Sequence, residues 1–322
     1  MSVRNDDSPA DSGTDRSRMM LDKLSTAWPR RAYVKKQELD PFFEDDGKED
    51  FLESLLPFRD TPQYQSSSPE LKSRVLSCGW LMYNAKTVQI ETDIVNPTCL
   101  SIIQREMPGL HGGDTQLAVC ETMVDESYHV HLVEQASRLT RERRALDHLV
   151  IPRFNLIRHM QKRQDGYGEP WQKRMVRFAT AVVSEIFISD YLHLLSESTE
   201  IQSFNRETVA AHRHDELAHS PLFRSLAQLF SAELTEAERA TFAEVLPQPV
   251  IWFADRELET WLAVLHQIGF PRADEMIQAC RGSGAADLTK LDYSGVLSLA
   301  EEIGVMDTAA NYDSVARHGL IA

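Results

Sequence analysis

The chain has 322 residues, of which 42% are hydrophobic, and this is enough for a large buried core. Its formal net charge of −15 argues against a protein that binds nucleic acid through phosphate contacts. The four cysteines form no CxxC pair and no metal-finger spacing, so they are typical of free thiols in a reducing cytoplasm rather than of a disulfide framework.

The N-terminal sequence predicts a short tail ahead of a single domain. Residues 1–16 are rich in Ser, Asp, Asn and Gly, which favours disorder, and they contain no apolar stretch of the kind found in signal peptides. One domain is therefore expected over residues 17–322. No stretch approaches 18 uninterrupted apolar residues, so we expect no membrane span.

Helical periodicity dominates the rest of the chain. Residues 41–68 are predicted to be mostly loop, and short helices are expected around a glycine turn at residues 282–284. No segment shows the alternation of a β-strand, so the fold class is predicted to be all-α. Longer helices are predicted over residues 19–28 (stopped by Pro29), 69–97, 114–143, 170–198, 201–230 and 235–269, with a break near Pro247.

Three of these helices carry a glutamate in the middle of an apolar face. Positions three, four and seven residues apart share one face of a helix. By this rule Glu185 lies among apolar neighbours, Glu126 shares its apolar face with His129, and Glu91 is a weaker, parallel case. An unpaired buried carboxylate costs on the order of several kcal/mol. Each of these glutamates therefore needs a partner inside the protein.

The segment HRHDELAH, residues 212–219, extends this pattern to a fourth helix. His212, Glu216 and His219 are spaced i, i+4, i+7 and fall within one narrow stripe, which apolar residues continue in both directions. His214 points to the opposite side of the helix. Three of the six ionisable side chains in this segment are thus predicted to face the protein interior.

Two of the four helices carry their glutamate in a Glu-x-x-His motif, and the other two carry a solitary inward glutamate. This is the ligand pattern of carboxylate-bridged di-iron and di-manganese bundles, and the imidazoles favour iron over magnesium or calcium. A single Glu-x-x-His on a helix is usually a surface pair. Two of them in this order with two solitary glutamates favour a dimetal site.

An aspartate stands immediately before each motif glutamate. Asp125 and Asp215 are interpreted in two ways: as acceptors that orient ligand histidines, or as exposed helix acids. The sequence leaves both interpretations open.

These motifs resemble the p-aminobenzoate N-oxygenase (AurF-like) family of arylamine oxygenases, which have a ferritin-like di-iron fold. The resemblance rests on a solitary Glu91, DESYH at residues 125–129, a second solitary Glu185, and HRHDELAH. AWPRRA at residues 27–32 and WLMYN at residues 80–84 are also similar. The resemblance covers roughly residues 20–310 and implies a ferritin-like helical bundle with additional flanking helices.

The resemblance also implies a non-haem di-iron enzyme that activates O2 and oxidises an amine nitrogen to hydroxylamine, nitroso or nitro. His212 would be a seventh ligand, which generic di-iron bundles lack and this family uses, and it would favour attack on nitrogen over a C–H bond. An external reductase or ferredoxin-type donor, a homodimer and a role in secondary-metabolite biosynthesis are implied as well. The implied ligands of the two iron ions are Glu91, Glu126, His129, Glu185, His212, Glu216 and His219.

The substrate is less well defined by the resemblance. The family position five residues before the first ligand carries an arginine that helps to hold the substrate carboxylate; here it is Lys86, which lacks the bidentate fork. An asparagine four residues after the second solitary glutamate is replaced by Ser189, and Tyr83 is retained. An acid-bearing amine is implied, with an amino acid, free or tethered to a carrier protein, as the competitor to p-aminobenzoate.

Two other functional classes stay open at this point. A di-iron hydroxylase or desaturase would act on carbon and leave the amine untouched. A metal-storage protein would assemble into a cage, and its subunits are shorter than this chain.

Overall fold

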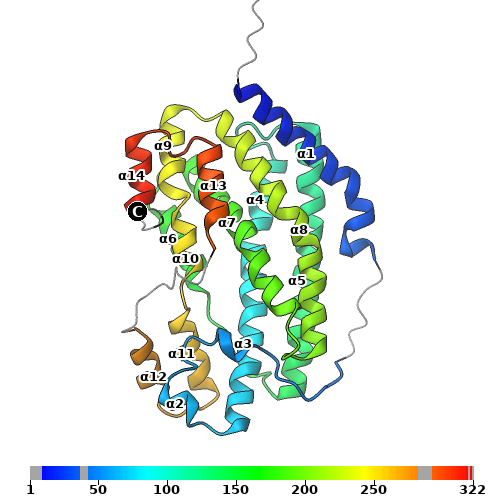
Figure 1. Cartoon of the computed structure of the whole chain (residues 1–322), viewed down its shortest axis with the longest axis vertical. Coiled ribbons are helices and arrows are strands. Elements are labelled where there is room, and N and C mark those ends of the chain that lie inside the picture. The colour runs from blue at the N-terminus through cyan, green and yellow to red at the C-terminus, as the bar shows by residue number, and fades with distance from the viewer. Residues whose placement is uncertain (1–8, 37–42, 282–291, 318–319, 321–322) are drawn as a thin grey trace, which may run out of the picture.

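The computed structural model describes the backbone of residues 9–36, 43–281, 292–317 and 320, and their side chains except at 9–12, 189–190 and 314–315. Every regular element within these ranges is helical, and one isolated bridge joins Glu49 to Ile201 (Figure 1). The predicted all-α fold, a helical bundle with additional flanking helices, is therefore confirmed. The turn predicted at residues 282–284 lies outside the described residues.

Four long helices make up the bundle: α3 (Pro69–Ile90), α5 (Gly113–Arg144), α7 (Pro170–Ser196) and α8 (Ser203–Ala232). Helix α3 packs along α5, and α7 packs along α8 (Figure 1). Their facing sides are apolar, which drives the association. Helix α7 meets the length and composition criteria for a membrane span, but 75% of its most apolar window is buried, as in the core helix of a bundle.

Shorter helices cover the two ends and one side of the bundle. Helices α6 (Asn155–Asp165) and α10 (Gln248–Phe253) lie against α7. Helices α9 (Glu236–Val245), α13 (Ser294–Glu302) and α14 (Ala309–Arg317) gather at one end, and α2 (Pro62–Gln65), α11 (Leu258–Gln267) and α12 (Ala273–Arg281) at the other (Figure 1). The 3₁₀ turns η1 (Tyr33–Lys35) and η2 (Glu53–Leu55) connect larger elements.

Helix α1 (Pro9–Arg31) corrects two expectations about the N-terminus. It begins inside the range predicted as a disordered tail, so residues 9–16 are helical, and it continues past Pro29 to Arg31. The helix is ordered by docking on α5 and α8, where Leu21 is fully buried, and composition does not reveal that contact. Because Pro29 lies in the last turn, it removes a single hydrogen bond and the helix ends two residues later.

The helix after Pro69 also continues beyond its predicted end at Pro97. A π-helical turn (Glu91–Val95) follows α3, and α4 (Asn96–Ile103) follows that turn directly. The Asn96 N–H donates to the Glu91 carbonyl five residues back, and Pro97 then stands in the first turn of α4, where its missing N–H costs nothing. Such π-turns often mark functional sites, and this one begins at a candidate ligand.

Candidate metal centre

The bundle core brings all seven predicted ligand residues together. Each of the four bundle segments contributes at least one of them, and none is more than 1% exposed to solvent. Burial to this extent requires each charged group to have a compensating partner. The residues are Glu91 from the π-turn, Glu126 and His129 from α5, Glu185 from α7, and His212, Glu216 and His219 from α8.

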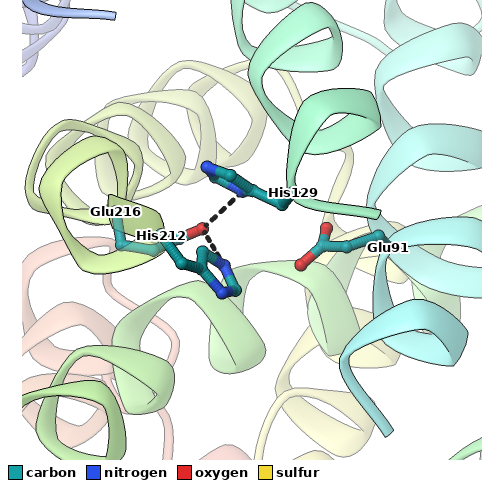
Figure 2. A group of neighbouring side chains, drawn as sticks. All are labelled: Glu91, His129, His212 and Glu216. Atoms are coloured by element: carbon teal, nitrogen blue, oxygen red, sulfur yellow. Dashed lines mark hydrogen bonds and ion pairs between the residues drawn. The ribbon is translucent and has the colours of Figure 1, made fainter. Parts of the chain in front are cut away.

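Their nitrogen and oxygen atoms form three overlapping groups, each with all its atoms within 4.8 Å of one another. Figure 2 shows the first group, in which Glu216 stands between two histidines and the Glu91 carboxylate faces them from the neighbouring helix. Two ions of a dimetal centre need overlapping sets of this kind. The three groups are Glu91–His129–His212–Glu216, Glu126–His129–Glu216–His219 and Glu91–Glu126–Glu185.

Glu216 is the central carboxylate of the cluster. Its Oε1 atom lies 3.0 Å from His212 Nε2 and 3.3 Å from His129 Nδ1 (Figure 2). The same atom lies 3.4 Å from His219 Nδ1. One oxygen atom therefore contacts all three histidines. The spacing i, i+4, i+7 explains the two contacts within α8, and the packing of α5 on α8 supplies the third.

Asp125 and Asp215 are both fully buried, so the structure favours the orienting interpretation over the exposed one. The pairing crosses between helices: Asp125 on α5 lies 3.3 Å from Nε2 of His219 on α8, and Asp215 on α8 lies 3.4 Å from Nε2 of His129 on α5. Each histidine thus turns its Nδ1 atom toward the central glutamates. A carboxylate behind a histidine in this way fixes the ring orientation and tautomer of a metal ligand.

Several buried polar atoms of the cluster have no hydrogen-bond partner in the described structure. Both oxygens of Glu91 are among them, and His219 Nδ1 lies only 2.9 Å from Glu126 Oε1 without hydrogen-bond geometry. Buried polar atoms without partners are rare in native proteins, and a metal ion bound among converging nitrogen and oxygen atoms would satisfy them. The donor set therefore fits a dimetal centre.

The carboxylates affect each other's protonation in the metal-free protein. Burial, together with the charges of the other glutamates, raises the pKa of Glu91 and of Glu185 well above the usual value. Burial also opposes ionisation of Glu126, but the charge of His219 together with hydrogen bonds from His129 and His219 outweighs it and lowers the pKa of Glu126 to about 2. The ionised form of Glu216 is favoured for the same reason, so its pKa is also lowered.

The pKa values of the three histidines are also shifted in different directions. Burial lowers the pKa of each, but for His129 and His219 the adjacent carboxylates outweigh it and raise the pKa well above the usual value. His212 has fewer acidic neighbours and the charge of His129 beside it, so its pKa is lowered. Metal ions would compete with protons for these ligand atoms, so metal binding is expected to release protons.

The raised pKa of Glu185 predicts a stability change in the metal-free protein. Above the usual glutamate pKa, Glu185 is ionised in the unfolded chain, whereas the folded protein favours its protonated form. The free energy of unfolding therefore falls as the pH rises toward the pKa of Glu185 in the folded protein. Glu185→Gln mimics the protonated form. We expect its Tm to exceed that of the metal-free wild type by about 2 °C or more near pH 8, and the difference to vanish near pH 4.

Thermal unfolding followed by circular dichroism across this pH range, in the presence of a chelator, measures the effect. The control is Glu200→Gln, which makes the same change at an exposed position beyond the end of α7. A Glu185→Gln protein that is less stable than wild type at every pH would show that the carboxylate is satisfied without metal.

The three predicted substrate contacts lie on α3 and α7, the helices that carry the solitary glutamates or lead into them. The Tyr83 ring stacks on Tyr191 at 5.8 Å, and burial together with the charges of Tyr191 and Glu216 raises the Tyr83 pKa. Lys86 has a partner that the sequence did not reveal: its Nζ atom lies 3.5 Å from Glu257 Oε1. Ser189 lies in α7, and its side chain is outside the described part of the structure.

Three residues that surround the cluster could not be identified from the sequence. Trp28 and Arg31 contact the buried aspartates, and Tyr191 stacks on Tyr83. The similar AWPRRA segment was the one signal for the first two. Their roles depend on how α1 packs, which no local pattern specifies.

Comparison with known proteins agrees with this geometry. A 4-aminobenzoate N-oxygenase from Streptomyces thioluteus is 27% identical over 297 residues, which is 91% of this chain and 88% of that protein. The family model described as P-aminobenzoate N-oxygenase AurF matches residues 14–304, a range that includes all seven candidate ligands. The chain belongs to the p-aminobenzoate N-oxygenase AurF family.

Proposed function

We propose that the protein is a non-haem di-iron oxygenase that uses O2 to oxidise an amine nitrogen to a hydroxylamine, nitroso or nitro group. The observation that carries the proposal is the buried cluster of four glutamates and three histidines with unpartnered oxygen and nitrogen atoms. Membership of the family supports the reaction class. The mixed imidazole and carboxylate ligands suit iron.

The overlapping groups suggest how two ions divide the ligands. Glu91, His129 and His212 would hold one ion, and the other would be held by Glu126, Glu185 and His219. Glu216, which contacts all three histidines, would bridge the two ions. The bound iron would supply the electrons and the Lewis acidity that activate O2.

The protein's own contribution is geometry and exclusion of water. The ligands are at most 1% exposed, which strengthens every electrostatic interaction in the site and protects the reaction from solvent. Asp125 and Asp215 hold the two outer histidine nitrogens, so the rings cannot rotate away from the glutamates. Burial and the neighbouring carboxylates raise the pKa of Glu91 and of Glu185, so binding of the ions would compete with protons for these two carboxylates.

The relative's name, 4-aminobenzoate N-oxygenase, supports an aminobenzoate-type substrate, and a free or carrier-tethered amino acid is the competing one. Tyr83 lies close enough to Glu216 and Glu91 for their charges to raise its pKa, so an aromatic substrate beside it would be near the cluster. We also propose an external electron donor of the ferredoxin or reductase type, a homodimer in the cytoplasm and a role in secondary-metabolite biosynthesis.

A single-turnover experiment tests the reaction class. Metal-free protein receives two equivalents of Fe(II) without air, then a panel of amines that includes p-aminobenzoate, then O2, and mass spectrometry reads the products. Oxygen on nitrogen is the expected result. A hydroxylated or unsaturated carbon with the amine untouched would assign the alternative, a di-iron hydroxylase or desaturase. Failure to consume O2 with any amine would remove the proposal.

Lys86 is the candidate group for binding the anionic part of the substrate. Its ammonium lies over the rings of Phe154 and Phe253 and beside Glu257, which also accepts hydrogen bonds from the Asn155 N–H. If Lys86 binds a substrate carboxylate, Lys86→Met raises KM by at least about tenfold, since a hydrogen bond to a charged group contributes roughly 1.5–3 kcal/mol. Steady-state kinetics with the best amine of the panel measures this.

Glu257→Gln is the matched variant. It keeps an oxygen acceptor for the start of α6 but removes the charge that competes for Lys86, so we expect KM to stay the same or to fall. Unchanged KM in Lys86→Met, with lower stability in both variants, would assign the lysine a purely structural role as the partner of Glu257.

A further inference from the structure

The end of α1 lies directly behind the candidate metal centre. We define residues 28–33 as the N-terminal clasp; they include the last turn of α1 and the first residue of η1. Helix α1 runs over the outer side of α5 and α8, the two helices that carry the Glu-x-x-His motifs (Figure 1). The clasp therefore reaches the side of the cluster opposite to the converging glutamates.

One side of the clasp holds Asp125. The indole Nε1–H of Trp28 lies 2.9 and 3.0 Å from the two carboxylate oxygens, and Arg31 Nη1 lies 3.4 Å from Oδ2. The same Oδ2 atom faces His219 Nε2 at 3.3 Å. Two groups of the clasp thus hold the Asp125 carboxylate, and this carboxylate orients the ring of His219.

The other side of the clasp holds Asp215. The backbone N–H of Tyr33 donates to this carboxylate at 2.9 Å, and Arg31 Nη1 lies 3.8 Å from Oδ1. Asp215 in turn faces His129 Nε2 at 3.4 Å. The two aspartates, on different helices, therefore share one guanidinium group.

Arg31 differs from Arg30, its neighbour in the AWPRRA segment. Its side chain is 19% exposed, and both aspartates are fully buried, so its charge contributes to the compensation of both. Arg30 is exposed, and the arginine that contacts the two aspartates is Arg31. A guanidinium presents several donors in one plane, which lets it serve two carboxylates at once, whereas an ammonium is a point charge.

We propose that Arg31 is a positioning residue that fixes both Asp–His pairs of the metal centre at once, and that Trp28 fixes only the pair formed by Asp125 and His219. The proposal rests on the dimetal centre proposed above. Docking of α1 and the affinity for metal are then linked, because the clasp orients one histidine for each ion. Loss of Arg31 loosens both rings, and loss of the Trp28 indole loosens one.

The test measures metal binding rather than turnover. Metal-free Arg31→Met, Arg31→Lys, Trp28→Phe and Arg30→Met proteins are titrated with Co(II) against a chelator, and Tm without metal is recorded for each. We expect Arg31→Met to weaken both binding steps by about 10–100-fold and Trp28→Phe to weaken one step. Arg31→Lys should recover part of the loss, and Arg30→Met should match wild type.

The outcomes separate the two proposals. Wild-type protein that binds fewer than two Co(II) ions per chain would overturn the dimetal centre itself. Two bound ions in wild type, with a lower Tm but both affinities within about twofold in Arg31→Met, would overturn the positioning role and leave a structural one. If Arg31→Met fails to fold, the same comparison is decided by Arg31→Lys and Trp28→Phe, whose unchanged affinities would also overturn it.

Discussion

Glu216→Ala is expected to abolish binding of both metal ions and to reduce turnover by at least about 10³-fold, a loss of about 4 kcal/mol of transition-state stabilisation. The reason is that Glu216 Oε1 contacts all three histidines, so it belongs to both histidine-containing groups. Its removal also leaves the charges of His129 and His219 with less compensation. Because the pKa of Glu216 is lowered, its ionised form stabilises the fold, and the metal-free variant should be less stable.

Metal content by elemental analysis and the rate of product formation in the single-turnover assay measure this prediction. Glu207→Ala is the matched control, since Glu207 is an exposed glutamate on the same helix. The control should retain two metal ions and full activity. A Glu216→Ala protein that keeps two ions per chain would show that the bridging assignment is wrong.

The inward direction of the ligands could be predicted from the sequence because it depends on local periodicity. A helix has a fixed angle per residue, so the neighbours of Glu185 and the i, i+4, i+7 stripe of His212, Glu216 and His219 are known once the helix is known. The structure confirms that these side chains are buried. The same argument gives no information on which helices face each other.

Features that depend on tertiary packing could therefore not be predicted from the sequence. Asp125 pairs with a histidine of the other motif rather than of its own, and this follows only from the packing of α5 on α8. Arg31 acts from 94 positions away in the chain. Glu257, the partner of Lys86, follows a short helix and adopts a left-handed backbone conformation with φ 54°, which no motif indicates.

Helices were predicted to end at Pro29 and at Pro97, and both continue past the proline for a related reason. Proline interrupts a helix when it removes a hydrogen bond that nothing replaces. At Pro97 the π-turn beginning at Glu91 shifts the bonding register, and Pro97 becomes an early residue of the next segment. At Pro29 the helix is held by its contacts with α5 and α8. Local propensity was overridden in both cases at positions that support the metal centre.

His212→Ala is expected to separate the two metal positions. His212 belongs to the group with Glu91, and the group of Glu126, Glu216 and His219 is complete without it. We therefore expect one ion to bind as in wild type and the other to bind at least about 100-fold more weakly. This loss of affinity exceeds the usual effect of removing a residue that only hydrogen-bonds a ligand. The lowered pKa of His212 favours the neutral imidazole, which is the form that binds metal, and its Nδ1 atom has no hydrogen-bond partner among the described residues.

The same variant tests the role of the third imidazole in the reaction. At metal concentrations that fill both positions, His212→Ala should consume O2 while oxygen on the amine product falls by about 100-fold or more, since a ligand acting in the transition state contributes several kcal/mol. His193→Ala, an exposed histidine on α7, is the control and should behave as wild type. Two tightly bound ions and full amine oxidation in His212→Ala would mean that six ligands suffice, and that the third histidine is a hydrogen-bond partner of Glu216 alone.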